Sequence, residues 1–215
     1  MLTIEKNVLP SPEQWEIIIE GMRNPMNSWD KMDSEEYPLG GGYLIGENDH
    51  KLMMQLAKAG PVHAKYRRMI PVFVTITAPL YWWTEFDAYK VGTVANSCSK
   101  MHTIHKKEFT LEDFSHEHLL FEAKDFLNTT IGYLNFCREK FLETGDKTWW
   151  WHMIQLLPES YNQKRTIMLN YEVLANIYHS RKGHKLNEWH TFCEWIEGLP
   201  YSELITGGND EGRCE

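Results

Sequence analysis

Apolar residues recur at helical spacing along most of the chain. After the helix-start residues Ser11-Pro12-Glu13, apolar side chains follow at helical intervals until Asn24-Pro25 ends the helix. The same periodicity predicts further helices over 49–59, 111–143, 161–182 and about 184–197. The stretch 111–143 divides into two helical pieces. The helix 161–182 places its buried side on Ile167, Leu174, Ile177 and Tyr178.

Only one strand is clear from the pattern. Residues 70–78 alternate and are rich in β-branched side chains. The run 80–83 is apolar on both faces and fits either a buried strand or the start of a helix. Residues 27–47 predict a loop, whose run Gly40-Gly41-Gly42 lacks the flanking strand and helix of a phosphate-binding loop. Because helices outnumber strands, we expect a mostly helical α+β fold.

The composition is that of a globular domain. With 215 residues, we expect one domain over 1–205 and a flexible polar tail over 206–215. The net charge of −8 argues against a nucleic acid polymer as partner, whereas a mononucleotide needs only a few local cations. No stretch approaches the roughly 20 apolar residues of a membrane span. The four cysteines form no Cys-x-x-Cys pair and no dense framework, and the N-terminus has no apolar signal core. We therefore expect reduced thiols and a cytoplasmic location.

Three stretches are candidates for ligand contacts. Residues 63–68 carry three cations, which either hold a phosphate or face water in an ordinary turn. Residues 85–101 are dense in hydroxyls and amides, and suit either a loop around a polar ligand or an ordinary polar loop. In the helix 161–182, the polar residues Asn170, Asn176 and Arg181 are costly to bury unless they are paired. Arg181 near the helix end either binds a ligand or complements the helix dipole.

Histidine spacing does not predict a metal site. His102 and His105 are three apart, and the other pairs also lack the four-residue helical spacing with an intervening Glu that marks a zinc hydrolase. Cys98 as a nucleophile would need a base that the sequence does not identify, so a buried neutral thiol is favoured.

Two spaced patterns follow one another along residues 50–200. In the first, the strand ends in Ala78-Pro79 and is followed by Gly92-Thr93, Asn96 and Ser99. In the second, Leu157-Pro158 is followed by Asn170, Leu174, Asn176 and Arg181, and then by His184 and Glu188. Together with His63 upstream, these patterns resemble the family of flavin-dependent thymidylate synthases. The sequence departs from the family where Ala88-Tyr89-Lys90 replaces an Arg-His-Arg cluster and where Glu172 replaces an Arg.

The resemblance implies a fold, a reaction and an assembly. The fold would be a curved antiparallel sheet flanked by helices, in a homotetramer whose sites are shared between subunits. The reaction would convert dUMP, or a related pyrimidine nucleotide, to its methylated product. It would use FAD, with methylenetetrahydrofolate as one-carbon donor and NADPH as reductant. Reduced flavin supplies hydride in such a reaction, and the protein positions the base.

The resemblance also implies roles for particular residues. Arg181 would bind and polarise the pyrimidine as the catalytic residue. The predicted nucleotide contacts are Glu85, Ser99, Lys100 and Arg181, and the predicted flavin contacts are His63, Lys90, Asn170 and Asn176. Two alternatives follow from the missing Arg-His-Arg cluster. One is a divergent enzyme on the same scaffold, acting on another pyrimidine nucleotide. The other is a non-catalytic protein that binds a nucleotide or flavin.

Overall fold

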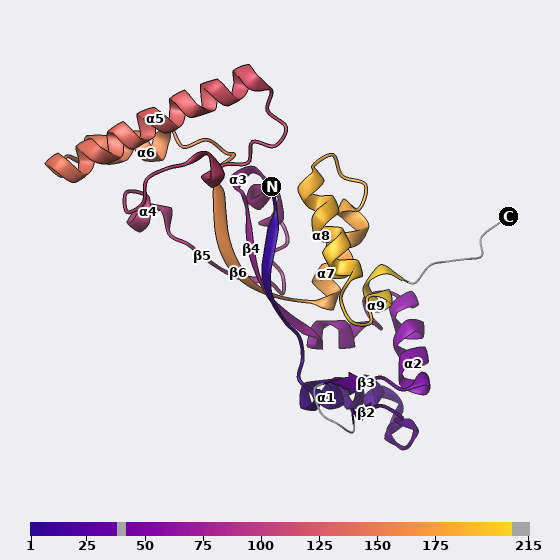
Figure 1. Cartoon of the computed structure of the whole chain (residues 1–215). Helices are drawn as coiled ribbons and strands as arrows, with labels where there is room; N and C mark the ends of the chain where they lie inside the picture. Colours follow the sequence, from indigo (N-terminus) through magenta and orange to yellow (C-terminus); the bar gives the residue numbers. More distant parts are fainter. Residues whose placement is uncertain (38–41, 208–215) are drawn as a thin grey trace. The chain divides into compact units, whose positions relative to one another are not determined.

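The computed structural model describes residues 1–37 and 42–207 (Figure 1). About 53% of the described residues are helical, and their strands form two sheets. The larger sheet has the order β1-β4-β6-β5, with β1 at Thr3–Val8, β4 at Pro71–Pro79, β6 at Asn162–Asn170 and β5 at Val94–Ser97. In the smaller sheet, β2 (Glu35–Glu36) runs antiparallel to β3 (Tyr43–Leu44). The predicted α+β class with an antiparallel sheet is confirmed.

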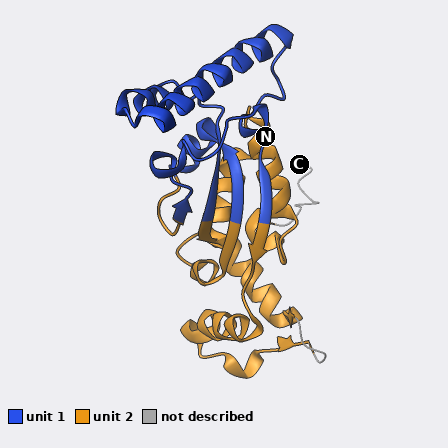
Figure 2. Ribbon diagram, turned by 60° about the vertical axis from the view of Figure 1, so that its left-hand side comes forward, with its two compact units in different colours: residues 1–5, 75–88, 95–166 blue, residues 6–74, 89–94, 167–215 orange. Residues whose placement is uncertain are grey.

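The chain divides into two compact units, coloured blue and orange in Figure 2. Unit 1 comprises Met1–Glu5, Thr75–Ala88 and Ala95–Thr166, and unit 2 comprises Lys6–Val74, Tyr89–Val94 and Ile167–Glu215. The colour change along β4 and β6 shows that both strands pass from one unit into the other. A single domain over 1–205 with a flexible tail stays a prediction, and residues 208–215 of that tail lie outside the described residues.

Unit 1 is built around a long helical hairpin. Its helices are α3 (Leu80–Phe86), α4 (Lys100–Thr103), the 3-10 turn η4 (Leu111–Asp113), α5 (Phe121–Thr144) and α6 (Lys147–Gln155). Buried side chains of α5 and α6 pack with those of the preceding loop into one cluster: Ile104, Phe109, Phe114, Leu127, Ile131, Leu134, Cys137 and Met153. A second aromatic group, Trp82, Trp83 and Phe86, is fully or almost fully buried on α3. Tryptophans therefore fill much of the core, as aromatic residues ordinarily do.

Unit 2 contains the remaining helices. These are α1 (Pro12–Arg23), η1 (Asn24–Met26), η2 (Trp29–Lys31), α2 (Glu47–Lys58), η3 (Lys65–Met69), α7 (Tyr171–Arg181), α8 (Asn187–Glu197) and α9 (Glu203–Thr206). The predicted start of α1 is confirmed, because Ser11 and Gln14 form a reciprocal capping box. The core of this unit joins Trp15, Met53, Leu174, Trp189 and Ile196, all nearly or completely excluded from solvent.

Two of the predicted helices are wrong in part. The helix 161–182 is instead the strand β6 followed by the helix α7, and Asn170 marks the change. In β6 burial alternates at Ile167 and Leu169, which is the period of a strand, whereas α7 buries a broad apolar face. Over 111–143, the first piece is only the short η4, and one uninterrupted helix, α5, makes up the rest.

Three other segments are clarified. The ambiguous run 80–83 starts helix α3. The predicted loop 27–47 contains η2 and the β2-β3 pair. Of its glycine run, Gly40 and Gly41 lie outside the described residues.

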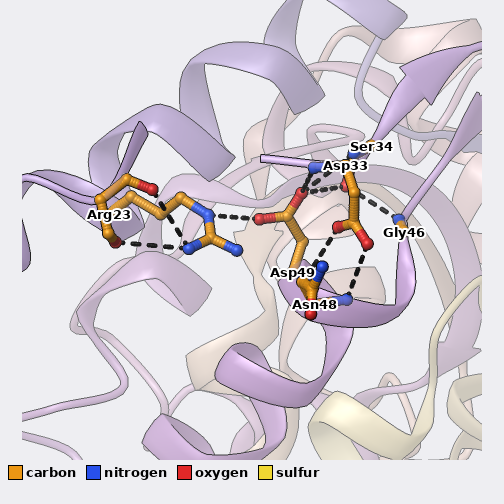
Figure 3. A network of polar contacts seen from close by, with 7 residues as sticks. Arg23, Asp33, Ser34, Gly46, Asn48 and Asp49 are labelled. Carbon is orange, nitrogen blue, oxygen red and sulfur yellow. Dashed lines mark hydrogen bonds and ion pairs between the residues drawn. The ribbon is translucent and has the colours of Figure 1, made fainter. Parts of the chain in front are cut away.

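A buried ion pair holds that loop against α1 and α2 (Figure 3). Arg23 Nε donates to Asp49 Oδ1 over 2.5 Å, and the side chains are 4% and 0% exposed. The other oxygen of Asp49 accepts from the backbone amides of Asp33 and Ser34 and from the Ser34 hydroxyl. The Asp33 carboxylate in turn accepts from the first-turn amides of Asn48 and Asp49 on α2. Burial alone would raise the pKa of Asp33, but these hydrogen bonds lower it below its usual value.

Candidate functional site

Helix α7 begins directly at the end of strand β6. Asn170 is both the last residue of the strand and the N-cap of the helix, where its Oδ1 accepts a 3.1 Å hydrogen bond from the amide of Val173. The amide of Tyr171 donates to the carbonyl of Ile70, next to β4. The sheet therefore fixes where α7 starts and which way Asn170 faces.

The segment 89–93 runs along the whole length of α7. At the C-terminal end, Arg181 Nε donates a 2.9 Å hydrogen bond to the phenol oxygen of Tyr89. At the other end, a Cβ added to Gly92 would lie 3.1 Å from Asn170 Nδ2 and 3.2 Å from a methyl of Val173. Gly92 has φ +80°, a conformation that favours glycine. Since α7 has 11 residues and is about 16 Å long, this segment spans the helix from Asn170 to Arg181.

Arg181 packs against two adjoining aromatic rings. Its guanidinium carbon lies 4.8 Å from the ring centroid of Trp189 and 5.7 Å from that of Tyr89. The two rings meet edge to face at 6.1 Å, and Trp189 is completely buried. Aromatic faces attract a cation and fix its plane, so this arrangement positions a guanidinium that can pair with an oxygen of a ligand.

A pair of opposite charges lies at the N-terminal end of α7. Arg67 Nη1 of η3 is 3.6 Å from Glu172 Oε2, and both side chains are 10% exposed. The cation that the family carries near Asn170 is replaced here by Glu172, and Arg67 from the predicted cationic patch balances it. Arg67 Nε, Glu172 Oε2 and Thr93 Oγ1 are buried without a hydrogen-bond partner in the part of the chain that the structure describes. Buried polar atoms of this kind are costly unless something pairs with them.

His63 lies at a largely apolar cavity of about 490 Å³. Residues of α1, η1, α2 and the segment 62–69 line it, among them Met22, Leu56, His63, Lys65 and Tyr66. Because η3 contributes Lys65 and Tyr66 to this cavity and Arg67 to the pair with Glu172, the same short helix connects the cavity with α7.

The other predicted residues of unit 2 are exposed. Lys90 lies on the segment 89–93, between the residues that meet the two ends of α7, and Asn176 lies on the exposed side of that helix. Of the predicted cationic patch 63–68, Ala64, Tyr66 and Arg67 are buried, so Arg67 is its one buried cation. The structure thus brings Asn170, Arg181 and the loop that carries Lys90 together along α7.

The predicted residues of unit 1 belong to helices α3 and α4. Glu85 is half-buried on α3. Ser99 caps α4, where its hydroxyl accepts from the amide of His102, and Lys100 is the first residue of that helix. Cys98 is exposed, so the expectation of a buried thiol at this position is wrong. Cys98 directly follows β5, an edge strand whose residues are all exposed.

Sequence reasoning missed the partners of the predicted residues. Tyr89 is identified from the sequence only as a departure from the family pattern, and Trp189 is not identified at all. Neither residue type indicates by itself that it stacks on an arginine 92 or 8 positions away. The charge reversal at Glu172 was a usable signal, because a buried anion requires a cation nearby.

Over 1–37 and 42–207, no three His, Cys, Asp or Glu side chains come together as metal ligands. Among the helices described, none combines the length and apolar character needed to cross a membrane.

The α+β fold of this chain is similar to that of solved flavin-dependent thymidylate synthases. The thymidylate synthase ThyX of Helicobacter pylori, solved with FAD and dUMP, matches with a TM-score of 0.64 at 15% identity, over 95% of this chain and 96% of that chain. A second structure of that enzyme matches at 0.63 and 14%, over 95% and 97%. The UMP/dUMP methylase PolB of Streptomyces cacaoi, bound with 5-Br dUMP, matches at 0.64 and 12%, over 96% and 94%.

These likenesses confirm the resemblance at the level of the fold. No protein-family model matches the sequence, and no curated protein matches it either.

Proposed function

We propose that this chain is a flavoprotein that binds a pyrimidine nucleotide and methylates dUMP or a related nucleotide. One observation carries the proposal: segment 89–93, part of the first pattern that resembles the thymidylate synthases, contacts both ends of α7, which carries Leu174, Asn176 and Arg181 of the second pattern. The segment and the helix are separated by about eighty residues in the sequence. The solved proteins of this fold are named for acting on dUMP or UMP, which supports the same substrate class here.

In this proposal Arg181 is the residue that binds the pyrimidine. Its plane is fixed by Tyr89 and Trp189, and a guanidinium can donate two parallel hydrogen bonds to a carbonyl or phosphate oxygen. Lys90, on the exposed loop beside it, adds a second cation for the phosphate. The roles of Glu85, Ser99 and Lys100 as nucleotide contacts stay predictions.

The residues present fit a flavin. The cavity at His63 is lined by methionines and other apolar side chains, which suit a planar ring system, and Lys65 supplies a cation for a phosphate. The unpaired Arg67 Nε close to this cavity is a further donor. We infer that His63, Lys65 and Tyr66 would hold FAD. The flavin contacts of Asn170 and Asn176 stay predictions. Bound FAD would supply the hydride, while these residues exclude water from the ring and orient it.

The proposed donor and reductant are methylenetetrahydrofolate and NADPH. A cytoplasmic location is proposed on the unpaired thiols, since Cys98, Cys137 and Cys193 are free.

A second function is favoured by one specific contact. The phenol of Tyr89 occupies Arg181 Nε, at the position where the family carries a His. A protein with this contact has one N–H donor fewer to offer a nucleotide, because Arg181 Nε already donates to the phenol oxygen. The second candidate is therefore a non-catalytic nucleotide- or flavin-binding protein on the same scaffold.

Flavin binding tests the proposal first. Protein incubated with FAD and then freed of unbound cofactor should keep the flavin absorbance, with affinity that falls as salt rises. Lys65→Gln should weaken FAD binding, whereas Lys58→Gln, an equally exposed lysine on α2, should not. If neither FAD nor FMN binds or protects the protein from thermal unfolding, the flavin assignment is wrong.

Turnover separates the two candidates. Protein loaded with FAD, then given dUMP, methylenetetrahydrofolate and NADPH, should form dTMP that mass spectrometry detects. Binding of FAD and dUMP without any product would favour the non-catalytic protein.

A further inference from the structure

A second cavity, of about 580 Å³, lies within unit 1 at the turn between α5 and α6. Its volume is in the range of small-molecule sites. The side chains that define it come from α4 and the segment after it, from the end of α5 and from α6: His102, His105, Phe141, Lys147, Trp150 and Trp151. None of these residues takes part in the proposed nucleotide and flavin contacts.

The walls of this cavity are aromatic. Trp150 and Trp151 meet edge to face with ring centroids 4.9 Å apart, and the His105 ring packs edge-on against Phe141 at 5.1 Å. Trp151 is 50% exposed, although indole is among the most apolar surfaces a protein can present to water. Neighbouring indole faces at an open cavity are suited to stack on a planar ring.

The polar groups of the cavity are cationic or can donate a proton. Lys147 is the first residue of α6, and the two histidines, His102 and His105, come from the part of the chain that precedes α5. His105 Nδ1 is buried and has no hydrogen-bond partner within residues 1–37 and 42–207. The backbone carbonyl of His105 accepts a 3.0 Å bond from Arg138 Nε, which fixes the position of this residue.

No carboxylate is among the residues that line the cavity, as far as the structure describes them. The nearest in sequence, Asp146, is the N-cap of α6 and accepts from the Thr148 amide over 2.8 Å. That hydrogen bond lowers the pKa of Asp146, and its carboxylate is engaged in capping the start of α6. In a chain of net charge −8, this cavity is a local site for an anion.

We propose that this cavity binds a small planar aromatic anion. The ring would stack on Trp151 and Trp150, and the anionic group would pair with Lys147 and accept a hydrogen bond from the His105 imidazole. The anion is either a carboxylate or a phosphate, because both offer the same acceptor oxygens to a lysine and a histidine.

Four probes separate the ring from the charge. Isothermal titration of the full-length protein would use 1-naphthoate, 1-naphthyl phosphate, the neutral 1-naphthylmethanol and cyclohexanecarboxylate, an anion without an aromatic ring. Both naphthyl anions or one of them should bind, and the tighter of the two identifies the anionic group. The neutral ring and the non-aromatic anion should each bind at least about fivefold more weakly.

Two variants with matched controls test the residues. Trp151→Ala should weaken the naphthyl anion about tenfold, whereas Trp29→Ala, at a tryptophan of similar exposure in unit 2, should not. Lys147→Gln should weaken the anions about threefold and leave the neutral ring unchanged, whereas Lys106→Gln should change neither. The proposal is overturned if no naphthyl anion binds at millimolar concentration, if the neutral ring binds as tightly, or if Trp151→Ala has no effect.

Discussion

Arg181 and Tyr89 are 92 residues apart in the sequence and are joined by a 2.9 Å hydrogen bond from Nε to the phenol oxygen. The contact connects the end of α7 with the loop that follows α3. It gives the arginine one fixed orientation, which the neighbouring ring of Trp189 reinforces. The residue that the sequence singles out is therefore positioned by two residues that the sequence does not single out.

Gly92→Ala should destabilise the protein more than an ordinary surface change. The left-handed φ of +80° costs an alanine about 1–2 kcal/mol, and the new Cβ would press on Asn170 Nδ2 and Val173. Gly60→Ala is the matched control, because Gly60 has φ +97° and nothing within 4 Å of the added carbon. Urea unfolding of both variants measures the difference. Equal losses of stability would mean that segment 89–93 is not packed against Asn170 as described.

Asp49→Asn should lower the free energy of unfolding by about 3–5 kcal/mol, because it leaves Arg23 as an unpaired buried cation. It also weakens the acceptor that holds the amides of Asp33 and Ser34. Asp30→Asn, at an exposed position of the same loop, should change stability by less than about 0.5 kcal/mol. Chemical denaturation followed by tryptophan fluorescence provides both values. Similar stabilities for the two variants would show that the ion pair between Arg23 and Asp49 does not stabilise the protein.

Alkaline pH should destabilise the protein through its buried tyrosines. Burial raises the pKa of Tyr66 from 10.0 to about 12, and the hydroxyl donates to the carbonyl of Met53. A folded pKa above the unfolded one contributes stability that is fully present below pH 10 and is lost as pH rises through about 12. Tyr66→Phe, which is less stable at neutral pH by about 1 kcal/mol, should lose less over this interval than the parent. The dependence of unfolding free energy on pH for both proteins checks this, and parallel curves would contradict it.

Assembly into a homotetramer should depend on α5. Phe121 and Phe126 are each 75% exposed on this helix, and Leu142 is 55% exposed. An apolar surface of this kind ordinarily marks an interface. Sedimentation should give a species near four times the 25.4 kDa of one chain. Phe126→Glu should weaken the assembly, whereas Ile17→Glu on α1, where Ile17 is 58% exposed, should not. A monomeric parent at micromolar concentration would remove the shared-site assembly from the account.

The sequence predicts the fold class and most helices because their signals are local. The capping box involves only Ser11 and Gln14, which are three positions apart, and the β-branched run of β4 is formed by residues that follow one another directly. The β6 strand was mistaken for helix because its apolar residues, read together with those of α7, also fit a helical period. The change of period occurs at Asn170, where the cap contact to Val173 is visible only once the chain has folded.

The candidate site was predictable only in part, for the same physical reason. Arg181 and Asn170 were predicted from a spaced pattern, but Tyr89, Trp189 and Arg67 act through contacts across the sequence. Pairing of charges and stacking of rings over such separations depend on the sheet, which brings the strands and their following segments together. No periodic pattern in a single sequence predicts these charge pairs and ring contacts.

Titration of dUMP into FAD-saturated protein, for the parent and for Arg181→Ala, tests the central claim most directly. The account predicts saturable binding by the parent and a loss of about 2–4 kcal/mol of binding free energy in the variant. Because Arg181 also packs on Trp189, the variant should lose about 1 kcal/mol of stability while it still unfolds cooperatively. A parent that does not bind dUMP, or an Arg181→Ala variant that binds it as tightly as the parent, would contradict the account.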